Sequence, residues 1–328
     1  MTARQNKFKI ITGSFISAVA CGIESQNWGA NDWRKQFDVM KAMGMDTVVI
    51  IRVGEVDSAM YKSKVMNTTI YEEDDLVELM FNEADRTGLK LYLGLYDTEY
   101  HWQRNDWDAE VAINKRLIEE LWEKHQHHKS FHGWYITHEG MMEQHMPKIW
   151  KPLIQKIKTY DSKKKILVSP RYGGEKWYSG DRSHLCLTPE LHYKHFDYIF
   201  GEMDGLIDYA AFMDGHTAFK SLAGFVEATH KICKKHKVGF WSNLEAFDRD
   251  QQNMRFPPIE WMKMRFKLEV VQPYVEKIIA FEASKFLSPY SMFISARNLY
   301  DRYLEYIDKK ATPRDLIYAS PRKIRRKQ

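Results

Sequence analysis

Acidic and polar side chains end several short apolar runs of this 328-residue chain. The run "FHGWYITHEG" at 131–140 is the clearest, because it finishes in His138 and Glu139. A carboxylate avoids an apolar interior unless its desolvation is compensated. Glu139 therefore either marks the point where the chain meets water or is directed at a chemical partner.

Similar residues end other apolar runs. They are Asp97 and Glu99, Arg171 and Tyr172, Glu202 and Asp204, Asn243 and Glu245, and Glu282 and Ser284. Like charges that converge raise each other's pKa, and proteins keep such clusters mainly where they do chemistry or bind metals. If these ends meet, they form a functional site.

Two carboxylates that flank one bond are the apparatus of glycoside hydrolysis. Strand alternation places Glu139 on the face of Tyr135, and places Glu245 on the face of Trp241 and Asn243. Both faces carry polar or aromatic side chains, which predicts that the two glutamates point to a common opening.

Other assignments of the acidic ends remain open. Glu202 and Asp204 in "GEMDG" share a face and are the rival partners of Glu139, suited to an inverting mechanism if the gap is wide. Arg171 is expected to pair with a carboxylate at the same rim. Alternatively, Glu282 does not belong to the site surface and is instead a buried ion-pair partner of Arg171.

Aromatic residues make up 14% of the chain. Flat rings bind the apolar faces of sugars, although large aromatic residues also dominate protein cores. The candidate sugar platforms are Trp102, Trp107, Tyr172, Trp177 and Trp241.

The elements that must position these residues alternate between apolar runs and amphipathic segments such as "NDWRKQFDVMKAMG". The apolar runs span 8–17, 45–55, 89–97, 131–139, 164–174, 196–205, 237–248 and 275–284. Eight strand–helix units predict an α/β fold, a single (β/α)₈ TIM barrel, with its chemistry at the carboxyl ends of the strands. A doubly wound sheet is the alternative, but no GxGxxG follows the first run.

We expect one domain over 1–328, with a barrel core at about 8–290 and a C-terminal helix and basic tail at 291–328. The start, "MTARQNKFKIITGSFISAVACG", resembles a secretory signal, but its interruption by Thr12, Gly13 and Ser14 favours a first strand. The location is periplasmic or secreted if this segment is a signal, and otherwise cytoplasmic.

Composition excludes several classes of partner. The net charge is only +5, without a basic stripe, which argues against nucleic-acid binding. No apolar stretch approaches the roughly 20 residues that span a membrane. The oligomeric state does not follow from the sequence.

Motifs for metals and cofactors are missing from the sequence. The three cysteines form no CxxC pair, and there is no GxSxG, HExxH or P-loop. The histidine-rich "HQHHKSFHG" at 125–133 contains no carboxylate at ligand spacing. We therefore expect no metal and no cofactor.

The segments "ITGSFI", "DWRKQFDVMKAMGMDTVVI" and "GWYITHE" resemble a family of bacterial glycosidase-like TIM-barrel proteins of formerly unknown function, found in Bacteroidetes. The similarity runs from about Ile10 to about Ser288. Glutamates that end strands four and seven are also the arrangement of the clan A retaining glycosidases. This resemblance implies that Glu139 is the general acid/base and Glu245 the nucleophile. Clan A enzymes carry an asparagine, which binds the sugar 2-hydroxyl, where this chain has His138.

We predict a glycoside hydrolase acting on an oligo- or polysaccharide, with Glu139 and Glu245 as its catalytic residues. The predicted substrate-binding residues are His138, Asn243, Glu202, Asp204, Arg171, Tyr172, Trp102, Trp177, Trp241 and Glu282. The alternatives are a non-catalytic carbohydrate-binding barrel and a metal-dependent sugar isomerase or epimerase.

Overall fold

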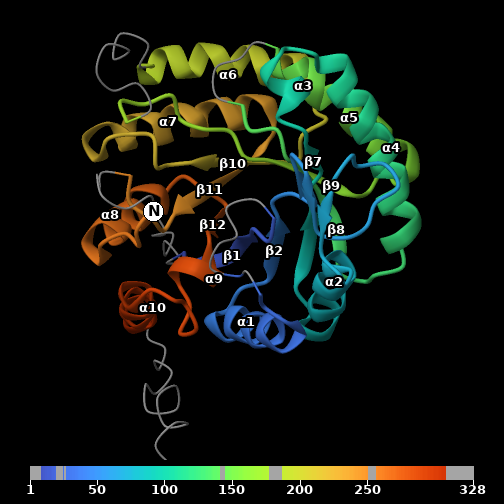
Figure 1. Ribbon diagram of the computed structural model, residues 1–328. Helices are drawn as coiled ribbons and strands as arrows, with labels where there is room; N and C mark the ends of the chain where they lie inside the picture. Colours follow the sequence, from blue (N-terminus) through green and yellow to red (C-terminus); the bar gives the residue numbers. More distant parts are fainter. Residues whose placement is uncertain are drawn as a thin grey trace, which may run out of the picture.

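Eight parallel strands close into a barrel in this computed structural model, which describes residues 9–19, 25, 27–140, 145–176, 187–249 and 256–307 (Figure 1). Around the barrel they are β1 (Ile11–Ile16), β2 (Thr47–Ile50), β6 (Lys90–Leu93), β8 (Phe131–Ile136), β9 (Lys165–Val168), β10 (Tyr209–Met213), β11 (Gly239–Glu245) and β12 (Lys277–Phe281). Strand β12 pairs with β1 and completes the ring. The predicted (β/α)₈ barrel is confirmed.

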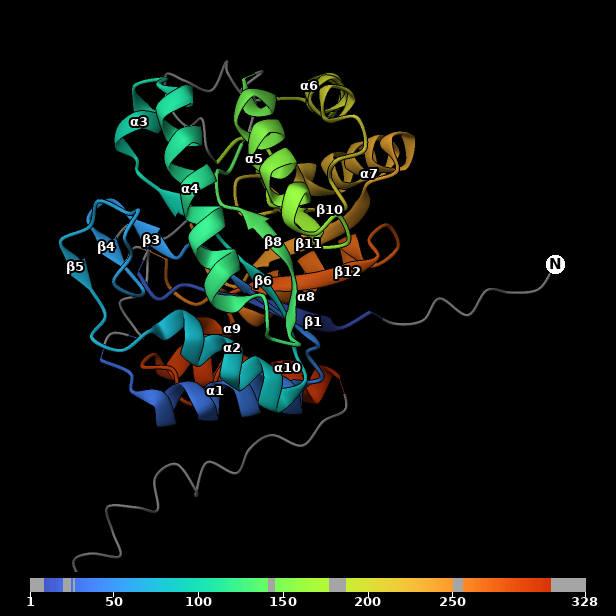
Figure 2. The ribbon, with the colours of Figure 1, turned by 90° about the vertical axis from the view of Figure 1, so that its right-hand side faces the viewer.

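Helices cover the outside of the barrel (Figures 1 and 2). They are α1 (Ala30–Met43), α2 (Leu76–Thr87), α3 (Tyr100–Gln103), α4 (Trp107–His125), α5 (Met146–Tyr160), α6 (Pro189–Met203), α7 (Phe219–His236), α8 (Trp261–Val271), α9 (Ala283–Phe286) and α10 (Ile294–Tyr306). None of the helices in the described ranges is long and apolar enough to cross a lipid bilayer.

Strand alternation divides the core into two layers, as the sequence predicts. Side chains such as Phe15, Tyr135 and Trp241 fill the barrel interior. On the opposite faces, Trp134 and Leu244 pack in the layer between strands and helices. Parallel strands buried on both faces explain the nearly continuous apolar runs.

A small second sheet follows β2 and was not expected from the sequence. Its strands are β3 (Gly54–Glu55), β4 (Ser58–Ala59), β5 (Ile70–Tyr71) and β7 (Tyr96–Asp97). Strand β7 comes directly after β6, so the sheet lies at the end of the barrel where the strands finish. We call this end the barrel mouth.

The predicted sixth strand, 196–205, is wrong, because these residues belong to α6 and the turn that follows it. Phe196, Ile199, Phe200 and Met203 are buried at helical spacing. Thr188 caps the helix by accepting from the backbone of Leu191, and Pro189 occupies its first turn. The sixth barrel strand is instead β10, which follows this turn and lies outside all eight predicted runs.

Candidate active site at the barrel mouth

Glu139 lies just beyond β8, where backbone pairing continues into the mouth. The backbone N–H of Arg171 donates to the carbonyl of Gly140 at 2.9 Å, which places these two chain segments side by side. Nη2 of Arg171 lies 3.2 Å from Oε2 of Glu139, so Arg171 has the carboxylate partner that was expected. The Tyr135 hydroxyl donates to Oε1 at 3.4 Å. The Glu139 side chain keeps 13% of its surface exposed.

Glu245 is the last residue of β11, and its side chain is only 2% exposed. Arg249 donates to both carboxylate oxygens, from Nε to Oε2 and from Nη2 to Oε1, each at 2.9 Å. Burial alone would raise the pKa of Glu245, but Arg249 and His216 lower it to about 2. Glu245 is therefore ionised at neutral pH.

The end of β10 supports Glu245 from the neighbouring strand. Asp214 accepts from the backbone N–H of Glu245 at 3.1 Å and from Nζ of Lys267, on α8, at 2.7 Å. Burial raises the pKa of Asp214, although Lys267 opposes that rise. A Cβ added at Gly215 would lie 1.5 Å from Oε2 of Glu245. Any larger residue at position 215 would therefore clash with this carboxylate.

Both glutamates influence the same arginine. Burial alone would lower the pKa of Arg249, but the charges of Glu245 and Glu139 raise it. Arg52, after β2, likewise has a pKa raised against burial by Glu139 and by Asp97 of β7. Charged side chains at the ends of β2, β7, β8 and β11 therefore lie close enough to shift each other's pKa values.

His138 directly precedes Glu139 in the chain, and its side chain is buried. Its Nε2 is 2.7 Å from Oε1 of Glu110 on α4, and the indole of Trp102 lies 5.2 Å from its ring. Burial alone would raise the pKa of Glu110, but its hydrogen bond with His138 lowers it. Asn243 is also buried, below Glu245, and its Nδ2 donates to the Ser169 hydroxyl at 3.0 Å.

Two predicted binding residues lie far from the mouth. Glu202 is an exposed residue of α6, and Asp204 caps the carboxyl end of that helix. This helix end leads into the start of β10, so it lies at the opposite end of the barrel. Glu202 and Asp204 are therefore excluded as catalytic partners of Glu139, because the segment predicted to be their strand is a helix.

Two predicted aromatic platforms are core residues. Tyr172 is buried between strands and helices, where its ring stacks on Phe212 at 5.3 Å. Trp241 faces the barrel interior as predicted, but near the start of β11, where it stacks on Tyr209 at 4.5 Å. Alternation along a strand gives the face of a residue but not its depth.

The remaining candidates have other surroundings. Trp102, on α3, is partly buried and packs against Trp107 at 5.5 Å. Glu282 is fully buried, accepts a hydrogen bond from Ser284 and lies 3.8 Å from Nζ of Lys285. Trp177 lies outside the described residues.

The sequence analysis missed five charged residues of the site: Arg52, Glu110, Asp214, Arg249 and Lys267. Asp214 directly follows the true sixth strand, so a correct assignment of that strand would have found it. Arg249 follows Glu245 by four residues, which is a usable signal. Glu110 and Lys267 come from helices, and nothing in their local sequence distinguishes them from surface charges.

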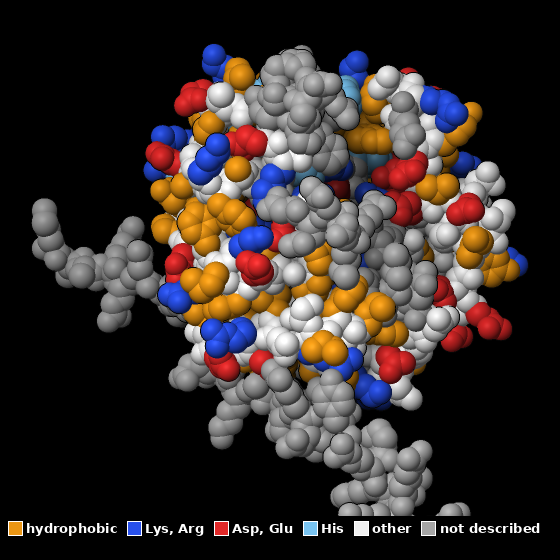
Figure 3. All heavy atoms as spheres, turned by 60° about the vertical axis from the view of Figure 1, so that its left-hand side comes forward, with side chains coloured by type: hydrophobic (Ala, Val, Ile, Leu, Met, Phe, Trp, Pro, Cys, Tyr) orange, Lys and Arg blue, Asp and Glu red, His pale blue; other side chains and the backbone are white. Residues whose placement is uncertain are grey.

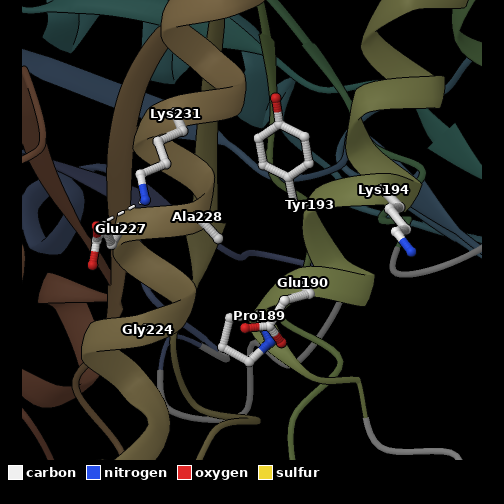
Figure 4. A pocket seen from close by; sticks show the side chains of 8 residues that line it. All are labelled: Pro189, Glu190, Tyr193, Lys194, Gly224, Glu227, Ala228 and Lys231. Atoms are coloured by element: carbon white, nitrogen blue, oxygen red, sulfur yellow. Dashed lines mark ion pairs between the residues drawn. The ribbon is translucent and has the colours of Figure 1, made fainter.

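Mixed charges gather on one face of the molecule, where basic, acidic and histidine side chains lie close together in the upper middle of the view (Figure 3). A separate pocket of about 380 Å³ lies between α6 and α7, outside the barrel (Figure 4). Tyr193 and the Glu227–Lys231 ion pair line this pocket, and none of the mouth residues does.

The solved structures similar to this chain include glycosidase barrels. A Bacteroides thetaiotaomicron protein, provisionally named an alpha-L-fucosidase, is 32% identical with a TM-score of 0.86 over 94% of this chain and 96% of its own. A mannanase from Thermotoga petrophila is 10% identical, with a TM-score of 0.53 over 84% and 88% of the two chains. A Thermotoga maritima beta-glucosidase is 9% identical, with a TM-score of 0.52 over 91% and 98%. The last two show the shared fold alone.

No curated protein matches this chain. The DUF4434 family, described as a domain of unknown function, matches residues 11–292, which include every strand of the barrel. The solved structures that resemble this chain show that its fold is a glycosidase-like barrel. The chain belongs to the DUF4434 domain family.

Proposed function

We propose that this protein is a glycoside hydrolase in which Glu139 is the general acid/base and Glu245 the nucleophile. One observation carries the proposal. Two glutamates lie at the ends of the fourth and seventh strands of one barrel, and Glu245 is held ionised by Arg249. An ionised carboxylate is what attack on an anomeric carbon requires.

In the proposed reaction, an oxygen of Glu245 bonds to the anomeric carbon while Glu139 gives its proton to the departing oxygen. Glu139 then takes a proton from a water molecule, which attacks the same carbon and releases the sugar with its original configuration. Both oxygens of Glu245 accept from Arg249, and each keeps a second lone pair that can attack the anomeric carbon.

The first substrates to test are aryl glycosides, beginning with an aryl alpha-L-fucoside because of the 32%-identical Bacteroides protein. On a substrate that the parent cleaves, Glu245→Gln and Glu139→Gln should each lower kcat/KM by roughly 10²-fold or more. Glu202→Gln is the matched control, since Glu202 is exposed on α6. NMR of the first product should show retained anomeric configuration.

Parent-like turnover in either mouth variant, or an inverted product, would contradict the assigned roles. Azide added to the reaction of a Glu245→Ala variant separates nucleophile loss from misfolding. It should restore turnover and give a glycosyl azide, because a small anion can occupy the space of the missing carboxylate.

A second function, carbohydrate binding without cleavage, rests on a different observation. Arginines already pair with both carboxylates, Arg171 with Glu139 and Arg249 with Glu245. A lapsed enzyme could keep this arrangement as a polar sugar-binding surface. Saturable glycan binding by calorimetry, with no product from the same glycan after prolonged incubation, would favour it over hydrolysis.

A further inference from the structure

A histidine cluster lies at the end of the barrel opposite the mouth. It occupies the carboxyl end of α4 and the turn that leads into the start of β8. His128, in this turn, places its Nε2 3.2 Å from Oε2 of Glu78, which belongs to α2. One ligand atom each from Glu78, His127 and His128 lies within 4.8 Å of the other two.

The His128 ring is held in one orientation. Its side chain is 3% exposed and stacks on Phe81, with ring centroids 4.8 Å apart and planes 10° from parallel. Its second nitrogen, Nδ1, lies 2.8 Å from Oδ2 of Asp85. The other oxygen of Asp85 accepts from the backbone N–H of Ser130 at 2.7 Å, which fixes that carboxylate in turn.

This arrangement is the one that metal-binding histidines use. A histidine ligand commonly has its second ring nitrogen held by a carboxylate, which orients the ring toward the metal. Here Asp85 holds Nδ1 and leaves Nε2 directed at Glu78. His125 Nδ1 lies 3.2 Å from the same Glu78 oxygen and orients that carboxylate.

We propose that Glu78, His127 and His128 form a binding site for a divalent transition-metal ion, with Zn²⁺ as the ion of choice. Two imidazole nitrogens and one carboxylate oxygen suit Zn²⁺, and a water molecule can complete its four-coordinate shell. His127 is exposed, so the ion has a path from solvent.

The expectation of no metal considered only spacing within the histidine-rich segment. The carboxylate comes instead from a residue 50 positions before His128 in the chain. The ion would connect α2 to the turn between α4 and β8. Because this site lies opposite the mouth, its role is to hold elements together rather than to take part in catalysis.

The test uses the full chain with any affinity tag removed, stripped with EDTA and titrated with ZnCl₂ in a calorimeter. We expect one Zn²⁺ per chain, retained through dialysis when metal content is measured by mass spectrometry. His127→Ala removes an exposed ligand and should weaken binding at least tenfold. Gln126→Ala, an exposed neighbour that supplies no ligand, should bind as the parent does.

Failure of the stripped parent to bind Zn²⁺, or parent-like affinity and stoichiometry in His127→Ala, would overturn the proposal. Glu78→Gln adds a second check, because it keeps the size of the side chain and should weaken binding at least tenfold. At the same ion concentration, Zn²⁺ should raise the Tm of the parent more than that of His127→Ala. None of these readouts depends on glycosidase activity.

Discussion

At the scale of single residues, the two glutamates of the mouth differ in how arginines compensate the burial of their negative charges. Glu245 is almost fully buried and its charge is neutralised by a bidentate arginine. Glu139 is more exposed and pairs with Arg171 through one contact at 3.2 Å. The two glutamates therefore have different environments, because Glu245 is enclosed by a bidentate arginine and Glu139 keeps some access to solvent.

The Arg249 pair makes a prediction about stability. Arg249→Met leaves Glu245 as a buried carboxylate without its main partner, which should lower the unfolding free energy at pH 7 by about 3 kcal/mol. The folded-state pKa of Glu245, about 2, lies below its unfolded value. The stabilisation is therefore complete above the unfolded pKa and is lost as pH falls toward 2. Urea unfolding should show a smaller parent–variant difference at about pH 3.5 than at pH 7.

Arg265→Met is the matched control for this measurement. Arg265 pairs with Glu269 at the same four-residue spacing, but both side chains are about half exposed. Its loss should cost far less stability than the loss of Arg249 at either pH, because solvent screens an exposed pair. Equal losses in the two variants would show that the burial of Glu245 adds nothing to its pair.

The residues foreseen from the sequence are those at strand ends. Glu139 and Glu245 could be found because a charge after an apolar run is visible locally. Tyr172 and Trp241 could not be separated from true rim residues, since an aromatic side chain suits both a core and a binding surface. Glu110 and Lys267 reach the site from helices, so only the three-dimensional packing identifies them.

At the scale of elements, the sixth strand shows where sequence patterns fail. Residues 196–205 contain three aromatic residues and one isoleucine, which suggested a strand, yet their apolar spacing is helical. Strand β10, "YAAFM", contains two alanines, which have low strand propensity. The other seven predicted runs overlap barrel strands, because their apolar content is dense and turns bound them.

Lys267 connects α8 to two strand ends and yields the prediction at this scale. Its Nζ donates to Asp214 at 2.7 Å and to the carbonyl of Glu245 at 3.0 Å, with only 4% of the side chain exposed. Lys267→Met should lower the unfolding free energy by roughly 3–5 kcal/mol, because the Asp214 carboxylate loses its counter-charge inside the protein. Chemical denaturation measures this loss.

Lys231→Met provides the comparison, since its ion pair with Glu227 on α7 is exposed on both sides. Lys231→Met should cost far less stability than Lys267→Met, because solvent screens the exposed pair. If Lys267→Met were equally mild, Asp214 would have to be protonated or hydrogen-bonded differently in the folded protein.

At the scale of the whole molecule, the barrel is completed by contacts between the two ends of the described chain. Strand β1 pairs with β12, with Ile11 opposite Ile278. Helix α10 adds a second connection, because the Tyr303 hydroxyl accepts from the backbone N–H of Ile11 at 2.7 Å. This bond joins residues 292 positions apart, so it forms only when the barrel has closed.

Tyr303→Phe therefore tests how far α10 stabilises the closed barrel. The ring remains, but the buried N–H of Ile11 loses its acceptor, which should cost about 1–3 kcal/mol of unfolding free energy. Tyr198→Phe, at an exposed position on α6, should change stability by less than about 0.5 kcal/mol. Hydrogen exchange adds the spatial readout, because the Ile11 amide should exchange faster in Tyr303→Phe while amides of β10 keep their protection. Unchanged exchange at Ile11 would mean that pairing with β2 and β12 holds the first strand in place, and that α10 only covers the end of the barrel.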